Sequence, residues 1–418
     1  MTATPVHSDR ERFLLDAVPE LEVAFPRSEY EERLQRLKTA ASEARVDVVF
    51  LSSPESMCWL SGFAAEWYQG QSPTTWYPAS GLAVHVEHDD WIHFDTEDEW
   101  ILAKCTSASR DLRIHRHGVN EDVLEFIVRE LRQQGWLDGA TVGLEMWASR
   151  PNRGYSELFQ AALERAGATV VDVTSLVRGL RRRKSVAELA RVRSAQRIAD
   201  IGMAAAIEKM APGMTELDVY AEVVYAMARA GGENPGITMP VASGKKSACV
   251  HALASRRVIR PGEIVNVDVS GVYDRYHANM ARTFSIGEPS PAVARRCAQV
   301  CGAVDVVAEV IRPGLPVREL LAAVEAYYTD AGLMDEWWWI GGYELGIAFP
   351  PDWVGEFWYE LETDPGDQTF IAGDVCNYEA NFYLPESAGL SMCINTMVFD
   401  ETGASFLQTT PNELVVIA

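Results

Sequence analysis

The first part of the chain alternates between short apolar runs and longer charged segments with helical spacing. The spacing predicts helices over 30–44, 121–134 and 155–166, and strands over 46–51, 81–86, 91–94, 141–145 and 169–173. Strands and helices in alternation pack as a sheet covered by helices. We therefore expect an α/β domain over residues 26–178, preceded by an irregular arm over residues 1–25.

A basic run from Arg178 to Lys184 separates this region from the rest of the chain. We interpret the run as a solvated linker rather than a binding patch. Directly after it, Ser185 and Glu188 have the spacing of a capping box, which predicts a helix from there to about Met210. A second domain is expected over residues 185–418.

The order of elements in the second domain occurs twice. Pro212-Gly213 and Pro313-Gly314 each precede a helical segment, and strands that include a turn of Gly and an acid then follow. Such self-similarity predicts an α+β domain with an internal pseudo-twofold repeat. A functional site would then lie between its two halves.

Both repeated strands carry the same polar pair. Asn and an acid stand four and six residues after the Gly of the turn, as Asn266 and Asp268 and as Asn377 and Glu379. Residues two apart share one face of a strand. We therefore expect Asp268 and Glu379 to converge, as an acid/base pair or as metal ligands.

Composition narrows the classes of function. The chain has 418 residues, 48% of them hydrophobic, and a formal net charge of −23. Such acidity disfavours binding to nucleic acid or to an anionic membrane surface. The seven cysteines show no CxxC pairing, and no apolar run approaches the roughly 20 residues that span a bilayer. We expect a soluble cytoplasmic protein with reduced thiols and a polar N-terminal segment.

Two histidines, His251 and His277, are the ones that lie beyond residue 180. Enzymes that move protons near neutral pH most often use histidine. For His251 the sequence supports a catalytic role and a structural one equally. His277 is expected to support a strand or the wall of the site.

Tryptophan is concentrated in one short region. Trp337, Trp338, Trp339, Trp353 and Trp358 lie within 22 residues. Aromatic faces can hold a cationic substrate, but core packing or a dimer interface would use the same residues.

Together these motifs resemble the creatinase/prolidase ("pita-bread") superfamily, which includes aminopeptidase P. The resemblance runs from the apolar stretch Met57–Phe63 through 244–251, 265–284 and 341–351 to 373–385. It implies a creatinase-type N-terminal domain, a pita-bread C-terminal domain and a homodimer.

The metallopeptidases of this superfamily hold two metals with five ligands: Asp, Asp, His, Glu and Glu. The corresponding positions in this chain are Asp268, Asn279, Tyr343, Glu379 and Ile394. Three of the five positions, Asn279, Tyr343 and Ile394, therefore no longer carry the family's metal ligand. The amide of Asn279 is a weak, neutral ligand. We expect no functional metal and no cofactor, and the binding of one residual metal ion remains open.

Creatinase keeps this fold without metals, and ectoine hydrolase looks similar. His251 falls on the histidine that transfers the proton in creatinase, and Glu379 falls on a retained carboxylate. The segments 271–277 and 349–353 look most like ectoine hydrolase, although Asp268 stands where that branch carries Glu. The resemblance implies His251, Asp268 and Glu379 as catalytic residues, with either acid as base or nucleophile. The expected substrate-binding residues are Tyr343, Asn279, His277, Asn377 and Trp353.

The preferred hypothesis is a metal-independent hydrolase that cleaves a C–N bond of a small cationic or amidine-like substrate. A metallopeptidase acting on Xaa-Pro dipeptides is the alternative. A lyase or cyclase, or a binding protein without catalysis, also remains open on this fold.

Overall fold

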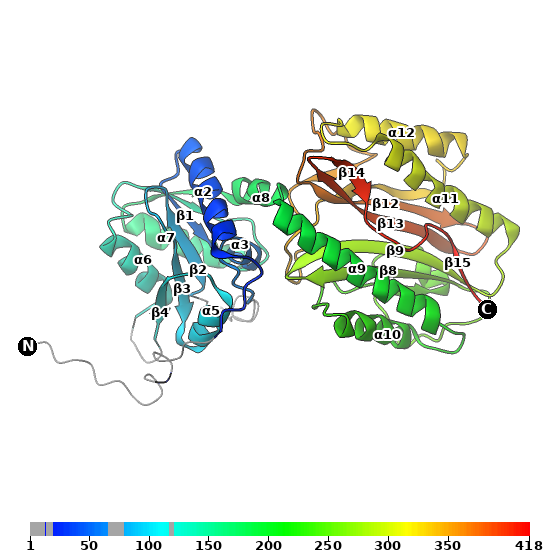
Figure 1. Ribbon diagram of the computed structural model, residues 1–418, viewed down its shortest axis with the longest axis horizontal. Helices are drawn as coiled ribbons and strands as arrows, with labels where there is room; N and C mark the ends of the chain where they lie inside the picture. Colours follow the sequence, from blue (N-terminus) through cyan, green and yellow to red (C-terminus); the bar gives the residue numbers. More distant parts are fainter. Residues whose placement is uncertain (1–12, 14–19, 66–78, 117–120) are drawn as a thin grey trace, which may run out of the picture. The chain divides into compact units, whose positions relative to one another are not determined.

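The computed structural model describes residues 13, 20–65, 79–116 and 121–418, which form two compact units over 1–180 and 181–418 (Figure 1). Most of the arm predicted over residues 1–25, including its polar segment 7–12, lies outside the described residues. Within the described part of the chain, no helix is long and apolar enough to cross a membrane.

The first unit is built on a six-stranded sheet in the order β4-β3-β2-β1-β5-β6. Its elements are α2 (Arg27–Glu43), β1 (Val48–Leu51), α3 (Pro54–Ser61), β2 (Gly81–His85), β3 (Ile92–Thr96), η1 (Glu97–Glu99), α5 (Trp100–Thr106), β4 (Asp111–His115), α6 (Val123–Gln133), β5 (Thr141–Leu144), α7 (Arg153–Arg165), β6 (Thr169–Asp172) and α8 (Thr174–Arg182). The pairs β1/β5, β3/β4 and β5/β6 are parallel, and β1/β2 and β2/β3 are antiparallel. The α/β prediction is confirmed.

The basic run is not the solvated linker that the sequence predicts. Its first part belongs to α8, and its last residues make ion pairs within the second unit. Arg182 contacts Asp374 at 2.7 Å. Lys184 contacts Glu344 at 2.6 Å, with both side chains almost fully buried. Basic side chains can be buried when they form ion pairs with carboxylates. The basic run in the sequence does not show where those carboxylates are.

The second unit contains a nine-stranded sheet that includes the path β11-β10-β12-β13-β9-β8-β7, with β14 on β13 and β15 on β9. Its elements are α9 (Val186–Lys209), α10 (Glu216–Arg229), β7 (Val241–Ser243), η2 (Gly244–Ala248), β8 (Ile264–Tyr273), β9 (Tyr276–Ile286), α11 (Pro291–Val310), α12 (Val317–Asp330), β10 (Trp337–Tyr343), β11 (Trp358–Glu360), β12 (Val375–Leu384), β13 (Gly389–Asp400), β14 (Gly403–Phe406) and β15 (Val415–Ile417). The predicted capping box of Ser185 and Glu188 begins α9.

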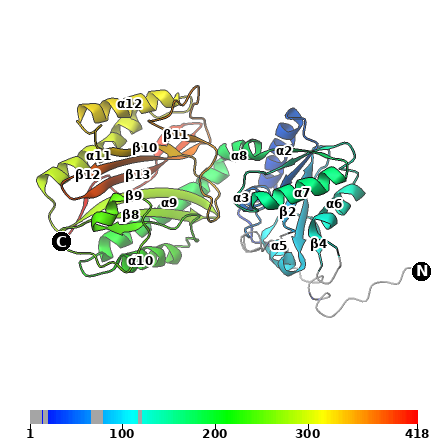
Figure 2. The ribbon, with the colours of Figure 1, turned by 180° about the vertical axis from the view of Figure 1, so that it is seen from behind.

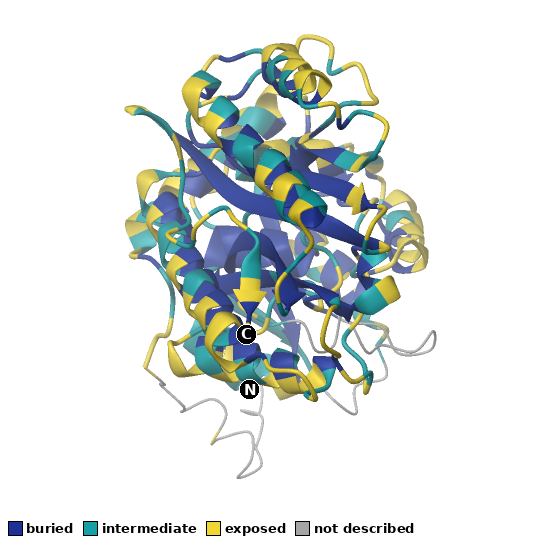
Figure 3. Ribbon diagram, turned by 90° about the vertical axis from the view of Figure 1, so that its right-hand side faces the viewer, coloured by how far each residue is buried: buried dark blue, intermediate teal, exposed yellow. Residues whose placement is uncertain are grey.

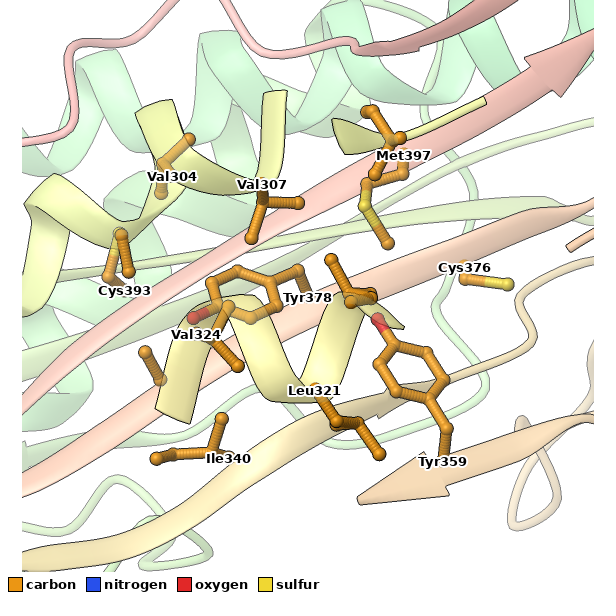
Figure 4. Close-up of a cluster of buried hydrophobic side chains, with 14 of the residues drawn as sticks. Val304, Val307, Leu321, Val324, Ile340, Tyr359, Cys376, Tyr378, Cys393 and Met397 are labelled. Carbon is orange, nitrogen blue, oxygen red and sulfur yellow. The ribbon is translucent and has the colours of Figure 1, made fainter. Parts of the chain in front are cut away.

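The predicted repeat is present as two helix pairs, each packed on one hairpin of the sheet. The pair α9 and α10 packs on β8 and β9, and the pair α11 and α12 packs on β12 and β13 (Figures 1 and 2). Each half buries its own apolar core, and Figure 4 shows the second one, around Tyr378 and Val324. The long strands are buried while the helices expose their outer faces (Figure 3). The halves meet where β9 pairs with β13.

Candidate active site

Alternation along two long strands turns both predicted acids toward the same side of the sheet. On β8, Val267 packs into the core beneath α9 and α10, so the next residue, Asp268, points to the opposite face. On β12, Tyr378 packs beneath α11 and α12, so Glu379 also points away from the helices. The side of the sheet that carries no helix core therefore receives both carboxylates.

The two acids occupy one row across four strands. Asp268 pairs with Ala281, Ala281 with Ile394, and Ile394 with Glu379. Three strand spacings put the Cα atoms of the acids about 14 Å apart. Both side chains line one pocket together with Ile394, so they approach it from opposite ends of the row.

Two asparagines connect the acids beneath the pocket. The backbone N–H of Tyr343 donates to Asn377 Oδ1 over 2.8 Å, which fixes the orientation of that amide. Asn377 Nδ2 donates to Glu379 Oε1 at 2.6 Å and to Asn279 Oδ1 at 3.2 Å. Asn279 Nδ2 in turn donates to Asp268 Oδ1 at 2.7 Å. Each carboxylate therefore faces an amide N–H group, which can only donate.

Both carboxyl groups have pKa values raised to about 7. Burial is the main cause for Asp268, followed by the charge of Glu379, and one amide N–H opposes them. For Glu379, burial is opposed by donors on Tyr343, Asn381 and Asn377. Three donors oppose burial at Glu379 and one opposes it at Asp268, and the two pKa values are alike. The pair is suited to holding one charge while exchanging one proton.

The pocket above the acids has a volume of about 220 Å³. Its lining consists of Ile237, Pro240, Val250, His251, Asp268, Trp338, Trp339, Tyr343, Trp353, Val354, Trp358, Glu379, Met392 and Ile394. The His251 side chain is exposed at the rim, and its ring meets Trp338 edge-to-face at 6.0 Å. Of the eight residues predicted for the site, the pocket therefore brings together His251, Asp268, Glu379, Tyr343 and Trp353.

The other three predicted residues lie outside the lining. Asn279 and Asn377 are buried and contact the acids rather than the cavity. His277 Nε2 accepts from the Gly236 N–H at 2.8 Å, and Nδ1 donates to the Arg275 carbonyl at 2.8 Å. Burial, and next the charge of Arg275, lowers the His277 pKa to about 3, so the ring is neutral.

The structure thus does not place His277 in the pocket, where we expected it to contact substrate. It holds Gly236, and the next residue, Ile237, lines the cavity. His277 therefore supports the wall of the site, which is the other role that the sequence allowed.

Several lining residues were not among the predicted ones. Trp338, Trp339 and Trp358 belong to the tryptophan cluster seen in the sequence, but spacing alone does not separate them from Trp337, which packs against the core. Asn381 lies outside the lining but donates to Glu379 at 3.2 Å; it extends the alternating pattern of β12 by one step, and this signal could have identified it.

Glu216, a fully buried carboxylate at the start of α10, fixes both ends of the loop that carries His251. One oxygen accepts from the backbone and hydroxyl of Ser243, at 2.9 and 2.8 Å. The other accepts from the backbone and hydroxyl of Ser255, at 2.9 and 2.7 Å, and from Lys246. No local pattern in the sequence indicated this residue.

Replacing Glu216 with Gln is expected to loosen the loop. The new NH₂ group would face donors that now meet a carboxylate oxygen, so stability should fall by about 2–3 kcal/mol. Hydrogen exchange of residues 243–255 should rise. The control is Glu208→Gln, which removes an exposed acid from α9. Unchanged hydrogen exchange in the Glu216 variant would show that Glu216 does not hold the ends of this loop.

The residues present do not fit a two-metal centre. In the described part of the chain, no group of three or more His, Cys, Asp or Glu side chains is arranged to hold a metal ion. At the three altered ligand positions, Asn279 turns its N–H to Asp268, the Tyr343 hydroxyl is bonded to Glu379, and Ile394 is apolar. A donor facing a carboxylate occupies the place that a cation would need.

Comparisons with known proteins give a consistent result. Residues 190–401 match the model of metallopeptidase family M24, and residues 33–183 match the creatinase/prolidase N-terminal domain. The chain is 26% identical to an ectoine hydrolase of Halomonas elongata, over 95% of this chain and 99% of that protein. It is 25% identical to a Xaa-Pro dipeptidase of Pyrococcus furiosus, over 92% and 99%. A solved Xaa-Pro dipeptidase from Bacillus anthracis superposes with a TM-score of 0.76 at 21% identity, over 93% of this chain and all of that one.

Proposed function

The chain belongs to metallopeptidase family M24 and is a hydrolase, and from this premise we propose that it cleaves a C–N bond of a small cationic or amidine-like substrate without a metal ion. The family and its two-domain fold, a creatinase-type domain followed by a pita-bread domain, are those that the motifs predicted. One observation carries the proposal. Asp268 and Glu379 accept hydrogen bonds from the amides of Asn279 and Asn377, and these N–H groups cannot bind a metal ion.

In the proposed reaction, Asp268 acts as the base. It takes a proton from water while the water oxygen bonds to the electrophilic carbon of the substrate. The C–N bond then breaks with its electron pair going to nitrogen, and His251 supplies the proton with which the amine leaves. Glu379 is positioned by hydrogen bonds from Asn377 and Asn381 and faces the cationic part of the substrate, whose charge favours the ionised carboxylate.

An activity screen after metal removal tests this function. Purified protein is treated with a chelator, its metal content is measured, and amidines, guanidines, lactams and Xaa-Pro dipeptides are offered. We expect turnover of a small C–N substrate with substoichiometric metal. Two bound metals per chain, together with dipeptide cleavage that chelation abolishes, would instead support the Xaa-Pro dipeptidase alternative. The names of several relatives favour that alternative, and the donor set of the site opposes it.

Replacing His251 with Ala should lower kcat by about 10²–10⁴-fold, the range for a lost acid/base group. The variant should stay folded, because the side chain is exposed and no core contact is lost. Leu253→Ala, an exposed change in the same loop, is the matched control. Full turnover in the His251 variant would refute its assignment as the proton donor.

A further inference from the structure

One wall of the pocket is a set of mutually packed aromatic rings. Tyr343 stacks on Trp358 at 5.5 Å with an interplanar angle of 19°, and Trp353 meets Tyr343 edge-to-face at 5.5 Å. Trp339 lies 5.3 Å from Trp358. Its indole N–H donates to Glu360 at 2.7 Å, which fixes the ring. The wall is therefore formed before a ligand arrives, which reduces the cost of binding.

Within the described parts of the chain, no Lys or Arg side chain lies over these four rings. Among the described residues, every cation–ring contact that the structure contains is made by other aromatic side chains. The face of an aromatic ring is electron-rich and attracts a cation, most strongly for Trp. The wall of Trp339, Tyr343, Trp353 and Trp358 therefore offers negative potential to a ligand.

The two acids add to the same potential from the floor of the pocket. Asp268 and Glu379 both line it, and no Lys or Arg is among the described residues of the lining. A ligand carboxylate placed there would meet like charge at short range in a partly desolvated site, where such repulsion is strong. The volume of about 220 Å³ also limits the ligand to a small molecule.

We infer that this pocket selects a compact organic cation that carries no carboxylate. The inference rests on the proposed function, because it names the substrate class of the same pocket. It separates this chain from a hydrolase of zwitterions, whose carboxylate would need a cationic partner. The aromatic wall and Glu379 face the charged group, and Asp268 faces the water that attacks the substrate.

Binding of a matched pair tests the inference without turnover. Choline and glycine betaine share a trimethylammonium group, and the second carries a carboxylate. Isothermal titration of the full-length protein at pH 8 should give a Kd for choline at least tenfold below that for glycine betaine. Equal affinities, or a preference for glycine betaine, would overturn the inference.

Two variants locate the effect. Trp358→Leu should weaken choline binding at least fivefold, since it removes one aromatic face. Trp147→Leu, which removes an exposed indole from the first unit, should leave the Kd unchanged. Glu379→Gln should narrow the gap between the two ligands. Undiminished choline binding in the Trp358 variant would place the cation elsewhere and refute the proposal.

The outcome for the ligand class is separable from that for the function. Hydrolysis of a zwitterion by metal-free protein, with no choline preference, would refute the ligand class and leave the hydrolase intact. Tighter binding of choline than of glycine betaine, with no C–N substrate turned over, would refute the proposed hydrolase function. It would still support the inference that the pocket binds organic cations.

Discussion

Asp268→Asn is expected to lose about 10²–10⁴-fold in turnover while becoming more stable than the parent protein at alkaline pH. The loss follows from its proposed role as the base. The new amide keeps the shape of the side chain, and its oxygen can still accept from Asn279. Catalysis and stability therefore change in opposite directions at this position, as is common where a buried active-site group destabilises the fold.

The stability gain follows from the raised pKa. The folded protein holds the Asp268 proton up to about pH 7, whereas the unfolded chain releases it near 3.8. The native state thus binds more protons between these values, and the stabilisation present below the unfolded pKa is lost as pH rises through the folded one. The total loss is up to about 4 kcal/mol, and Asn, which does not ionise, avoids it.

Urea unfolding from pH 4 to pH 8.5 measures this effect. The advantage of the variant should grow across the interval and level off above pH 7. Asp305→Asn, a change at an exposed position of α11, should follow the parent curve. Parallel curves for parent and Asp268 variant would show that the carboxyl group has an ordinary pKa. Retained turnover would remove Asp268 from the mechanism.

Lys184→Met is expected to destabilise the second unit by about 3–5 kcal/mol, the usual cost of leaving a buried charge unpaired. Its partner Glu344 is buried and also accepts from the backbone N–H groups of Glu356 and Phe357, at 3.0 and 3.3 Å. These bonds anchor the segment between Trp353 and Trp358. The loss of the ion pair should therefore also weaken binding in the pocket.

A second substitution separates charge from packing. The double variant Lys184→Met/Glu344→Gln leaves no unpaired charge, and the Gln oxygen can still accept from the two backbone N–H groups. It should recover most of the lost stability in thermal and urea unfolding. A double variant as unstable as Lys184→Met would mean that the cost comes from packing and not from the ion pair.

The sequence could predict the faces of the strands and the identity of the two acids. Side chains on a strand alternate with a period of two, so Asp268 had to lie opposite its valine neighbours and Glu379 opposite Tyr378. The capping box at Ser185 is equally local, because its two partners are three residues apart. Resemblance in the motifs supplied the fold.

The sequence could not predict which polar groups meet across the fold. His277 was expected either to contact substrate or to support the wall of the site, and only the structure shows it hydrogen-bonded to Gly236 while His251 lines the pocket. The direction of the Asn279 amide depends on Asn377, 98 residues away. The direction of this amide decides whether Asp268 faces an N–H donor or an oxygen that could bind a metal ion.

The sequence by itself thus determined the elements, the family and the two carboxylates, because each depends on short-range spacing. The tertiary structure decided that the acids are bonded to amides, that Glu216 holds the His251 loop, and that Lys184 is buried against Glu344. Such contacts join residues far apart in the chain, and burial and hydrogen bonding select them only once the sheet has brought them together.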